Sequence, residues 1–136
     1  FMNVLLFLTP KKDVAYLYED YSLRQALEKM EYHRYSAIPI ISRNGNYLGT
    51  LTEGDLLWYI KNSHNLSIHE AEEENIMKIS RYHDNKAIKA NCDLMDVFQT
   101  AMNQNFIPVT DDDGTFIGII TRKNIFNYLK KNYDLI

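Results

Sequence analysis

The sequence predicts an α+β fold made of two tandem β-α-β-β-α repeats, packed with pseudo-twofold symmetry as a single module. One observation behind this prediction is a short motif that occurs twice in the same register. The other is that strand-like and helix-like apolar patterns follow one another in the same order around both copies. The chain has 136 residues, of which 46% are hydrophobic and 24% are charged. A chain of this length and composition can bury a packed core without disulfides.

The repeated motif begins with glycine, continues to a threonine three residues later, and ends with Asp or Asn after three more. Its first copy is Gly49–Asp55 and its second is Gly118–Asn124. A proline-centred apolar run precedes each copy, at Ala37–Ile41 and Phe106–Thr110. Corresponding positions in the two copies are 69 residues apart. Such a repeat indicates two copies of one supersecondary unit.

Each proline-centred run is the first strand of a predicted hairpin. The turns contain Asn44-Gly45 and Asp113-Gly114, which favour a type I′ turn with positive φ at both central positions. Pro39 and Pro108 lack an N–H group, so we expect each at a sheet edge or a strand end. The four predicted strands of the hairpins are Ala37–Ile41, Tyr47–Thr52, Phe106–Thr110 and Phe116–Thr121.

A short strand and a helix precede each hairpin, and a second helix follows it. Apolar residues recur at helical spacing from Leu23 to Met30 and from Leu94 to Met102. Ser22 with Gln25 predicts a capping box for the first helix. Leu23 and Leu94 are 71 residues apart, so the second repeat is two residues shorter between helix and strand. The remaining predicted elements are strands Val14–Leu17 and Ala87–Ile88 and helices Glu53–Lys61 and Arg122–Lys131.

The repeats divide the chain into residues 7–61, a linker over residues 62–74, and residues 75–131. The linker region is polar and contains the acidic residues 72–74, which predicts a solvated helix or loop.

These motifs resemble those of the CBS-domain pair, also called the Bateman module. The resemblance implies a regulatory module without catalysis, which binds an adenine nucleotide in clefts between the two repeats. The stretches Lys12–Ala15 and Tyr35–Pro39 are similar to stand-alone bacterial pairs that bind cyclic di-AMP or AMP-type nucleotides.

The chemistry of the motif suits such a ligand. Thr52 and Thr121 stand where a strand runs into a helix, and the free N–H groups and dipole of a helix start favour an anion. Asp55 and Asn124 lie one helical turn further along on the same side, where a carboxylate or amide can bind ribose hydroxyls. Thr52…Asp55 is equally the pattern of a plain capping box, and both roles can coexist.

The resemblance implies two unequal clefts, in which the proline-centred strand of one repeat faces the threonine helix of the other. Thr121 is followed by Arg122 and Lys123, whereas Thr52 is followed by Glu53. A guanidinium can bind a phosphate bidentately, so we expect the phosphorylated ligand in cleft A. The cleft A residues are Lys12, Ala15, Tyr35, Ser36, Ala37, Pro39, Thr121, Arg122 and Asn124. The cleft B residues are Ala87, Phe106, Ile107, Pro108, Thr52 and Asp55.

Other classes of protein fit the sequence less well. The net charge of −3 argues against a nucleic-acid binder, and the longest N-terminal apolar run is too short to span a membrane. The four histidines lack the spacing of a helical zinc site, so we expect no metal. A single cysteine, Cys92, favours a reducing cytoplasmic compartment. No nucleophile–base pair is visible, so we expect no enzyme and no required cofactor.

The sequence therefore predicts a cytoplasmic sensor of AMP, ADP, ATP or cyclic di-AMP that signals to an unidentified target protein. Family members pair as homodimers, and the apolar surface of the predicted helices would suit such a pair. The alternative function is a ligand-free module for dimerisation or protein interaction, which keeps the motif for folding.

Overall fold

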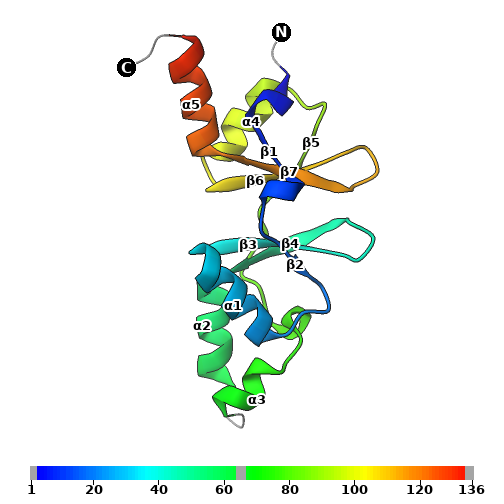
Figure 1. Cartoon of the computed structure of the whole chain (residues 1–136), viewed down its shortest axis with the longest axis vertical. Coiled ribbons are helices and arrows are strands. Elements are labelled where there is room, and N and C mark those ends of the chain that lie inside the picture. Colours follow the sequence, from blue (N-terminus) through cyan, green and yellow to red (C-terminus); the bar gives the residue numbers. More distant parts are fainter. Residues whose placement is uncertain (1–2, 64–66, 134–136) are drawn as a thin grey trace. The chain divides into compact units, whose positions relative to one another are not determined.

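The computed structural model describes residues 3–63 and 67–133. The chain divides into two compact units, and each is described by itself. Unit 1 comprises residues 1–14, 45–47 and 85–136, and unit 2 comprises residues 15–44 and 48–84. The units therefore exchange segments relative to the sequence repeats, because the first residues of the chain cluster with the second hairpin (Figure 1).

Unit 1 contains a four-stranded sheet in the order β1-β7-β6-β5. Strand β1 runs antiparallel to β7, β7 antiparallel to β6, and β6 parallel to β5. The strands are β1 (Leu8–Pro10), β5 (Ile88–Lys89), β6 (Phe106–Thr110) and β7 (Phe116–Thr121). The helices are η1 (Val4–Phe7), η2 (Lys11–Asp13), α4 (Leu94–Ala101) and α5 (Arg122–Asn132), where η marks 3-10 turns.

Unit 2 contains a three-stranded sheet in the order β2-β3-β4, with β2 parallel to β3. Its strands are β2 (Leu17–Tyr18), β3 (Ala37–Ile41) and β4 (Tyr47–Thr52), the last of which begins in unit 1 with Tyr47. Its helices are α1 (Leu23–His33), α2 (Glu53–Asn62), α3 (Ile68–Glu72) and the turn η3 (Ile76–Lys78).

Each unit has its own apolar core. In unit 1 the turn η1 contributes Val4 and Phe7, which pack with residues of β5, β6, β7, α4 and α5. In unit 2 helix α1 contributes Leu23, Ala26 and Met30, which pack with residues of all three strands. Burial of these side chains provides most of the free energy that holds the helices on their sheets.

Most predicted elements are confirmed. The four hairpin strands have the predicted bounds, and the helices that follow them extend one residue further than predicted. The capping box at the start of α1 is present, with Gln25 N donating to Ser22 Oγ at 3.2 Å and Ser22 N to Gln25 Oε1 at 2.8 Å. Helix α1 ends at His33 and α4 at Ala101.

The predicted type I′ turns are wrong. Gly45 and Gly114 have positive φ values of 93° and 84°, but Asn44 and Asp113 do not. In the second turn Asp111 replaces the expected backbone pattern, because its Oδ1 accepts from the N–H groups of Asp113 and Thr115, both at 2.9 Å. A side-chain acceptor at the first turn position stabilises such a turn with only the glycine in the left-handed region.

The prolines also differ from expectation, since Pro39 and Pro108 lie in the middle of interior strands. The neighbouring parallel strands are only two residues long and begin to pair one residue after each proline, at Ile40 and Val109. Each proline therefore lies where its strand is locally an edge, so its missing N–H leaves no gap in the parallel ladder.

Strand β1 was not predicted, and the two short strands are shifted. Strand β2 is Leu17–Tyr18 rather than Val14–Leu17, and β5 is Ile88–Lys89 rather than Ala87–Ile88. The linker contains the short helix α3 and the turn η3, in keeping with the predicted solvated helix or loop, and residues 64–66 lie outside the described part.

Gly118 allows β1 to approach β7 closely. It pairs with Pro10 and has a φ of 154°. A Cβ at this position would collide with the carbonyl oxygen of Thr9 and with Leu8. Because that oxygen is backbone, the collision is relieved only if β1 moves away from β7.

We expect Gly118→Ala to lower the free energy of unfolding by about 2 kcal/mol or more, through strain and loosened β1 pairing. Gly54→Ala is the matched control, because a Cβ there meets only Thr52 Oγ1 at 3.7 Å. Urea denaturation of both variants checks the prediction. Equal stabilities would contradict the close approach of β1.

Candidate functional site

The candidate site is built around the two places where a hairpin strand runs into a helix. At the start of α2, Asp55 N donates to Thr52 Oγ1 at 3.1 Å, and Thr52 N donates to Asp55 Oδ2 at 3.0 Å. At the start of α5, Asn124 N donates to Thr121 Oγ1 at 3.1 Å. Both threonines are thus N-caps that orient the first turn of their helix.

Asp55 is buried and both of its carboxylate oxygens are engaged. Its side chain is 5% exposed. Besides the bond from Thr52, Oδ1 accepts from Tyr82 N at 3.0 Å. The carboxylate therefore joins the start of α2 to the segment that leads toward the second repeat. The capping role of Asp55 is confirmed, whereas its predicted contact with a ribose stays a prediction.

Asn124 occupies the corresponding place in unit 1 with the opposite hydrogen-bond polarity. Its Nδ2 donates to Phe7 O at 3.2 Å and to Thr9 Oγ1 at 2.6 Å. Asp55 accepts from the backbone of the lead-in segment of repeat two, and Asn124 donates to the lead-in segment of repeat one. The change from Asp to Asn thus matches the groups that each residue meets.

Gly49 also lies against a lead-in segment. Thr50 N donates to Asp84 Oδ1 at 2.9 Å, and Arg81 Nε donates to the same oxygen at 2.7 Å. A Cβ on Gly49 would collide with that carboxylate oxygen. Burial raises the pKa of Asp84, but the hydrogen bonds from Arg81 and Thr50 and the charges of Arg81 and His83 outweigh it, so the pKa is lowered.

Arg122 has a structural role in addition to its predicted one. Its Nε donates to Ala101 O at 2.7 Å and its Nη2 to Met102 O at 3.4 Å. The guanidinium thus satisfies carbonyl groups at the end of α4. The exposed Lys123, the next residue, has no hydrogen bond or ion pair with the residues that the structure describes. It adds a second cation to the α5 junction.

Lys12 lies toward the other end of β7 from Thr121. The antiparallel register places Pro10 opposite Gly118, so Lys12, in η2, follows the end of β1 that points away from the α5 junction. Gly118 and Thr121 are three residues apart, or about 10 Å along a strand. The structure therefore does not bring Lys12 and Thr121 together around one small group.

The other cleft A residues lie in unit 2. Ala15 and Pro39 are buried, Tyr35 and Ala37 are half-buried, and Ser36 is exposed. Glu53 N donates to Ser36 O at 3.0 Å, so the start of β3 lies beside the start of α2.

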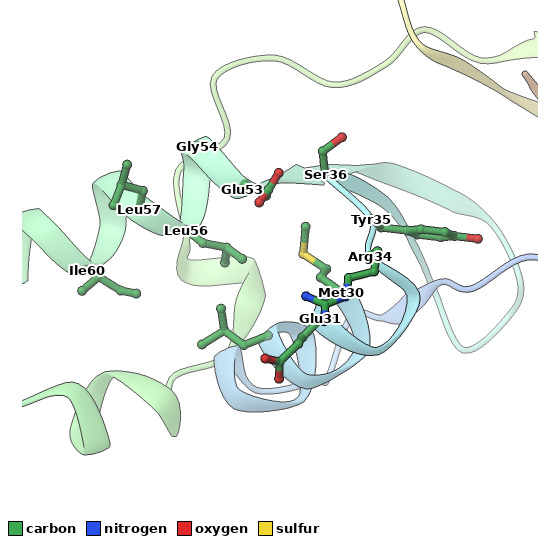
Figure 2. Close-up of a pocket in the computed structure, with 11 residues that line it drawn as sticks. Met30, Glu31, Arg34, Tyr35, Ser36, Glu53, Gly54, Leu56, Leu57 and Ile60 are labelled. Carbon is green, nitrogen blue, oxygen red and sulfur yellow. The ribbon is translucent and has the colours of Figure 1, made fainter. Parts of the chain in front are cut away.

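Tyr35 and Ser36 line a pocket of about 700 Å³ between α1 and α2 (Figure 2). Its apolar part consists of Leu27, Met30, Leu56, Leu57 and Ile60, and its charged part of Glu31, Arg34 and Glu53.

Three cleft B residues of unit 1 belong to one buried strand. Phe106, Ile107 and Pro108 are buried in β6, and Phe106 pairs directly with Thr121. Ala87 is half-buried just before β5. The remaining cleft B residues, Thr52 and Asp55, lie in unit 2. The predicted membership of both clefts draws on both units and stays a prediction.

Several residues at these junctions were missed by the sequence analysis. Thr9, Tyr82 and Asp84 bind the motif residues, but nothing local in the sequence marks a contact across so many residues. Arg34 caps α1 with a φ of 58°, the left-handed conformation that usually favours glycine. A helix end without glycine or asparagine gives little sequence signal for such a residue.

The described residues contain no group of three or more His, Cys, Asp or Glu side chains placed to bind a metal ion. Burial and the nearby Asp96 and Asp93 raise the pKa of the Cys92 thiol, which keeps it protonated and weakly nucleophilic at neutral pH. Among the described helices, none is both long and apolar enough to cross a membrane.

The CBS-domain family model matches residues 7–62 and 75–131, which is most of the chain. The chain belongs to the CBS-domain family. The two matches correspond to the two copies of the motif, so the α+β module is a CBS pair. No curated protein sequence matches this CBS pair.

Solved structures of other CBS proteins share its fold. CbpB in complex with c-di-AMP is 23% identical with a TM-score of 0.86, and the match covers 96% of this chain and 85% of that one. A CBS-domain protein from Streptococcus pneumoniae TIGR4 is 26% identical with a TM-score of 0.80, covering 92% and 84%. CBSX2 in complex with AMP is 22% identical with a TM-score of 0.78, covering 96% and 98%.

We expect Asp55→Ala to destabilise this CBS pair by about 2–3 kcal/mol in the absence of any ligand. The substitution leaves the N–H groups of Thr52 and Tyr82 without their acceptor. Asp112→Ala, at an exposed turn position, is the control and should change little. Chemical denaturation of ligand-free protein measures both, and an unchanged stability of Asp55→Ala would contradict the structural role.

Asp84 makes a second, pH-dependent prediction. Because its folded pKa is lowered, its contribution to stability is present above its unfolded pKa of about 3.9 and is lost as the pH falls through the folded value. Its side chain is 38% exposed, so we expect Asp84→Asn to cost only about 1 kcal/mol at pH 7. The difference from the unsubstituted chain should shrink as the pH is lowered below 4. A difference independent of pH would contradict this account.

Proposed function

We propose that this CBS pair is a non-catalytic regulatory module that binds an adenine nucleotide and signals to a partner protein. The observation that carries the proposal is the threonine-capped helix start that occurs once in each unit. The first N–H groups of such a helix lack intrahelical acceptors and can bind a phosphate. The ligands of CbpB and CBSX2, c-di-AMP and AMP, support the class of ligand.

The α5 junction is the better of the two for a phosphate. Arg122 and Lys123 follow Thr121, whereas Glu53 follows Thr52 and repels an anion. Lys123 is free to bind a phosphate, and Arg122 keeps further N–H groups beside those that bind α4. Cleft A, as predicted from the sequence, is therefore our proposed phosphate site.

The spacing within unit 1 favours an extended ligand. Lys12 and Thr121 lie toward opposite ends of β7, so they contact different parts of any molecule that reaches both. A ligand with separated charged groups, such as cyclic di-AMP, meets this condition better than AMP. ADP and ATP remain candidates within the same class.

The second candidate function is a ligand-free module for dimerisation or protein interaction. A specific observation favours it: Asp55, Asn124 and the two motif glycines all hold lead-in segments in place. Folding alone is therefore a sufficient reason for these four residues. It does not account for the cations beside Thr121.

We also propose that the protein forms a homodimer in the cytoplasm. Large apolar side chains on the helices, including Leu57, Trp58, Phe126 and Met95, are more than half exposed in the single chain. Such surface suits a contact between copies. A single cysteine suits a reducing compartment.

A thermal-shift panel with AMP, ADP, ATP, cyclic di-AMP and S-adenosylmethionine tests the proposal. A ligand at about 100 times its dissociation constant adds roughly 2.7 kcal/mol of stability, which gives a clear rise in Tm. No shift with any of these ligands would favour the ligand-free module.

Variants then locate the phosphate. We expect Lys123→Ala to weaken binding of the active nucleotide about tenfold, since a charge-assisted hydrogen bond contributes roughly 1.5 kcal/mol. Arg122→Ala should lower both affinity and stability. Lys89→Ala, an exposed lysine of β5, is the control. Unchanged affinity by titration calorimetry in both junction variants would refute the assignment of the phosphate to cleft A.

A further inference from the structure

We propose that two copies of the chain pair head to tail, with α5 of one copy docked on the α1–α2 pocket of the other. In this pairing Phe126 of one copy enters the pocket of unit 2 in its partner. The inference rests on the homodimer proposed above and defines which surfaces meet. Three features of the described residues carry it: an open pocket in one unit, a protruding ring in the other, and opposite charges around them.

The receiving surface is the pocket between α1 and α2. It has a volume of about 700 Å³, and five of its eleven lining residues are Leu, Ile or Met. Leu57 stands at its mouth with 59% of its surface exposed. Figure 2 shows Glu31 and Glu53 on the two helices that form the walls. Within the described parts of the chain, neither carboxylate has an ion-pair partner.

The corresponding place in unit 1 is built differently. Arg122 stands at the position of Glu53, 69 residues later. Its guanidinium reaches the end of α4, where it donates to Ala101 O and Met102 O, and so joins the two helices that are separated by the pocket in unit 2. Phe126 takes the position of Leu57 and is 67% exposed. One repeat therefore presents a hollow, and the other presents an aromatic side chain.

The charges around these surfaces are opposite. Helix α5 carries four basic residues and no acidic one. Lys123 and Lys130 lie three residues before and four residues after Phe126, so they share its face of the helix. Within residues 3–63 and 67–133, neither lysine forms an ion pair. They match the carboxylates of Glu31 and Glu53 beside the pocket.

These features discriminate between the two ways of pairing. If like units met, α5 would face α5, and its basic residues would repel one another while the α1–α2 pocket stayed unfilled. Head-to-tail pairing brings lysines to carboxylates and places an aromatic ring in an apolar pocket, and a two-fold axis repeats each contact. Like-charge juxtaposition across an interface disfavours the wrong partner. The pairing of unlike units is therefore the favoured one.

Disulfide trapping in the full chain tests the arrangement. In a Cys92→Ser background, Leu57→Cys and Phe126→Cys are made separately, one of them with a tag that changes its mobility. Both positions are exposed, so both variants should fold, which circular dichroism checks. Under mild oxidation we expect little cross-linking of either variant alone and a mixed cross-linked dimer when the two are combined. Tyr82→Cys, a 92% exposed position, is the control for random collision.

Sedimentation equilibrium gives an independent measurement. We expect Phe126→Ser to weaken self-association at least tenfold and Tyr82→Ser to leave it unchanged. Cross-links of Leu57→Cys or Phe126→Cys with itself, at the expense of the mixed product, would overturn the head-to-tail arrangement. A monomer at 100 μM protein would overturn it as well. Nucleotide titration of the same variants separates the two ideas, because pairing is read without ligand and binding is read without cross-linking.

Discussion

The structure depends on how each hairpin holds a lead-in segment against its second strand. In unit 1 the absence of a side chain at Gly118 lets β1 lie against β7, and Asn124 fixes that segment through Thr9. This contact carries Val4 and Phe7 into the core. In unit 2 Asp84 and Tyr82 are held in the same way by Thr50 and Asp55. Backbone donors and acceptors that would otherwise be buried without partners are thereby satisfied.

This constraint changes how the repeated motif is interpreted. Glycine and Asp or Asn are explained by the lead-in segments, so their presence is compatible with a module that binds nothing. The threonine and the residues after it are less constrained by folding, because an N-cap needs only a hydroxyl. A basic pair after Thr121 and an acid after Thr52 therefore carry more information about a ligand than the motif itself. The function of the site is read best from the positions at which the two copies differ.

The sequence predicted the hairpins and helices because their signals are local. A strand run, a glycine turn and a capped helix lie within fifteen residues of one another, as in Ala37 to Thr52. The exchange of segments could not be predicted in this way. Strand β1 is three residues long and its partner begins at Phe116, so no periodicity or turn residue marks the pairing. For the same reason the junction residues Thr52 and Thr121 were identified, while Asp84 and Thr9, which complete their surroundings, were not.

The differences between the repeats follow from what each position meets. Asn124 faces a carbonyl and a hydroxyl, so an Asp there would set its carboxylate against the Phe7 oxygen with no proton between them. Asp55 faces two backbone N–H groups, where an Asn could accept only through its single oxygen. Arg122 and Glu53 divide in the same manner, since one binds the carbonyls of α4 and the other borders an open pocket. A duplicated unit has thus become two complementary ones, and its asymmetry gives a basic junction in one unit and an apolar pocket in the other.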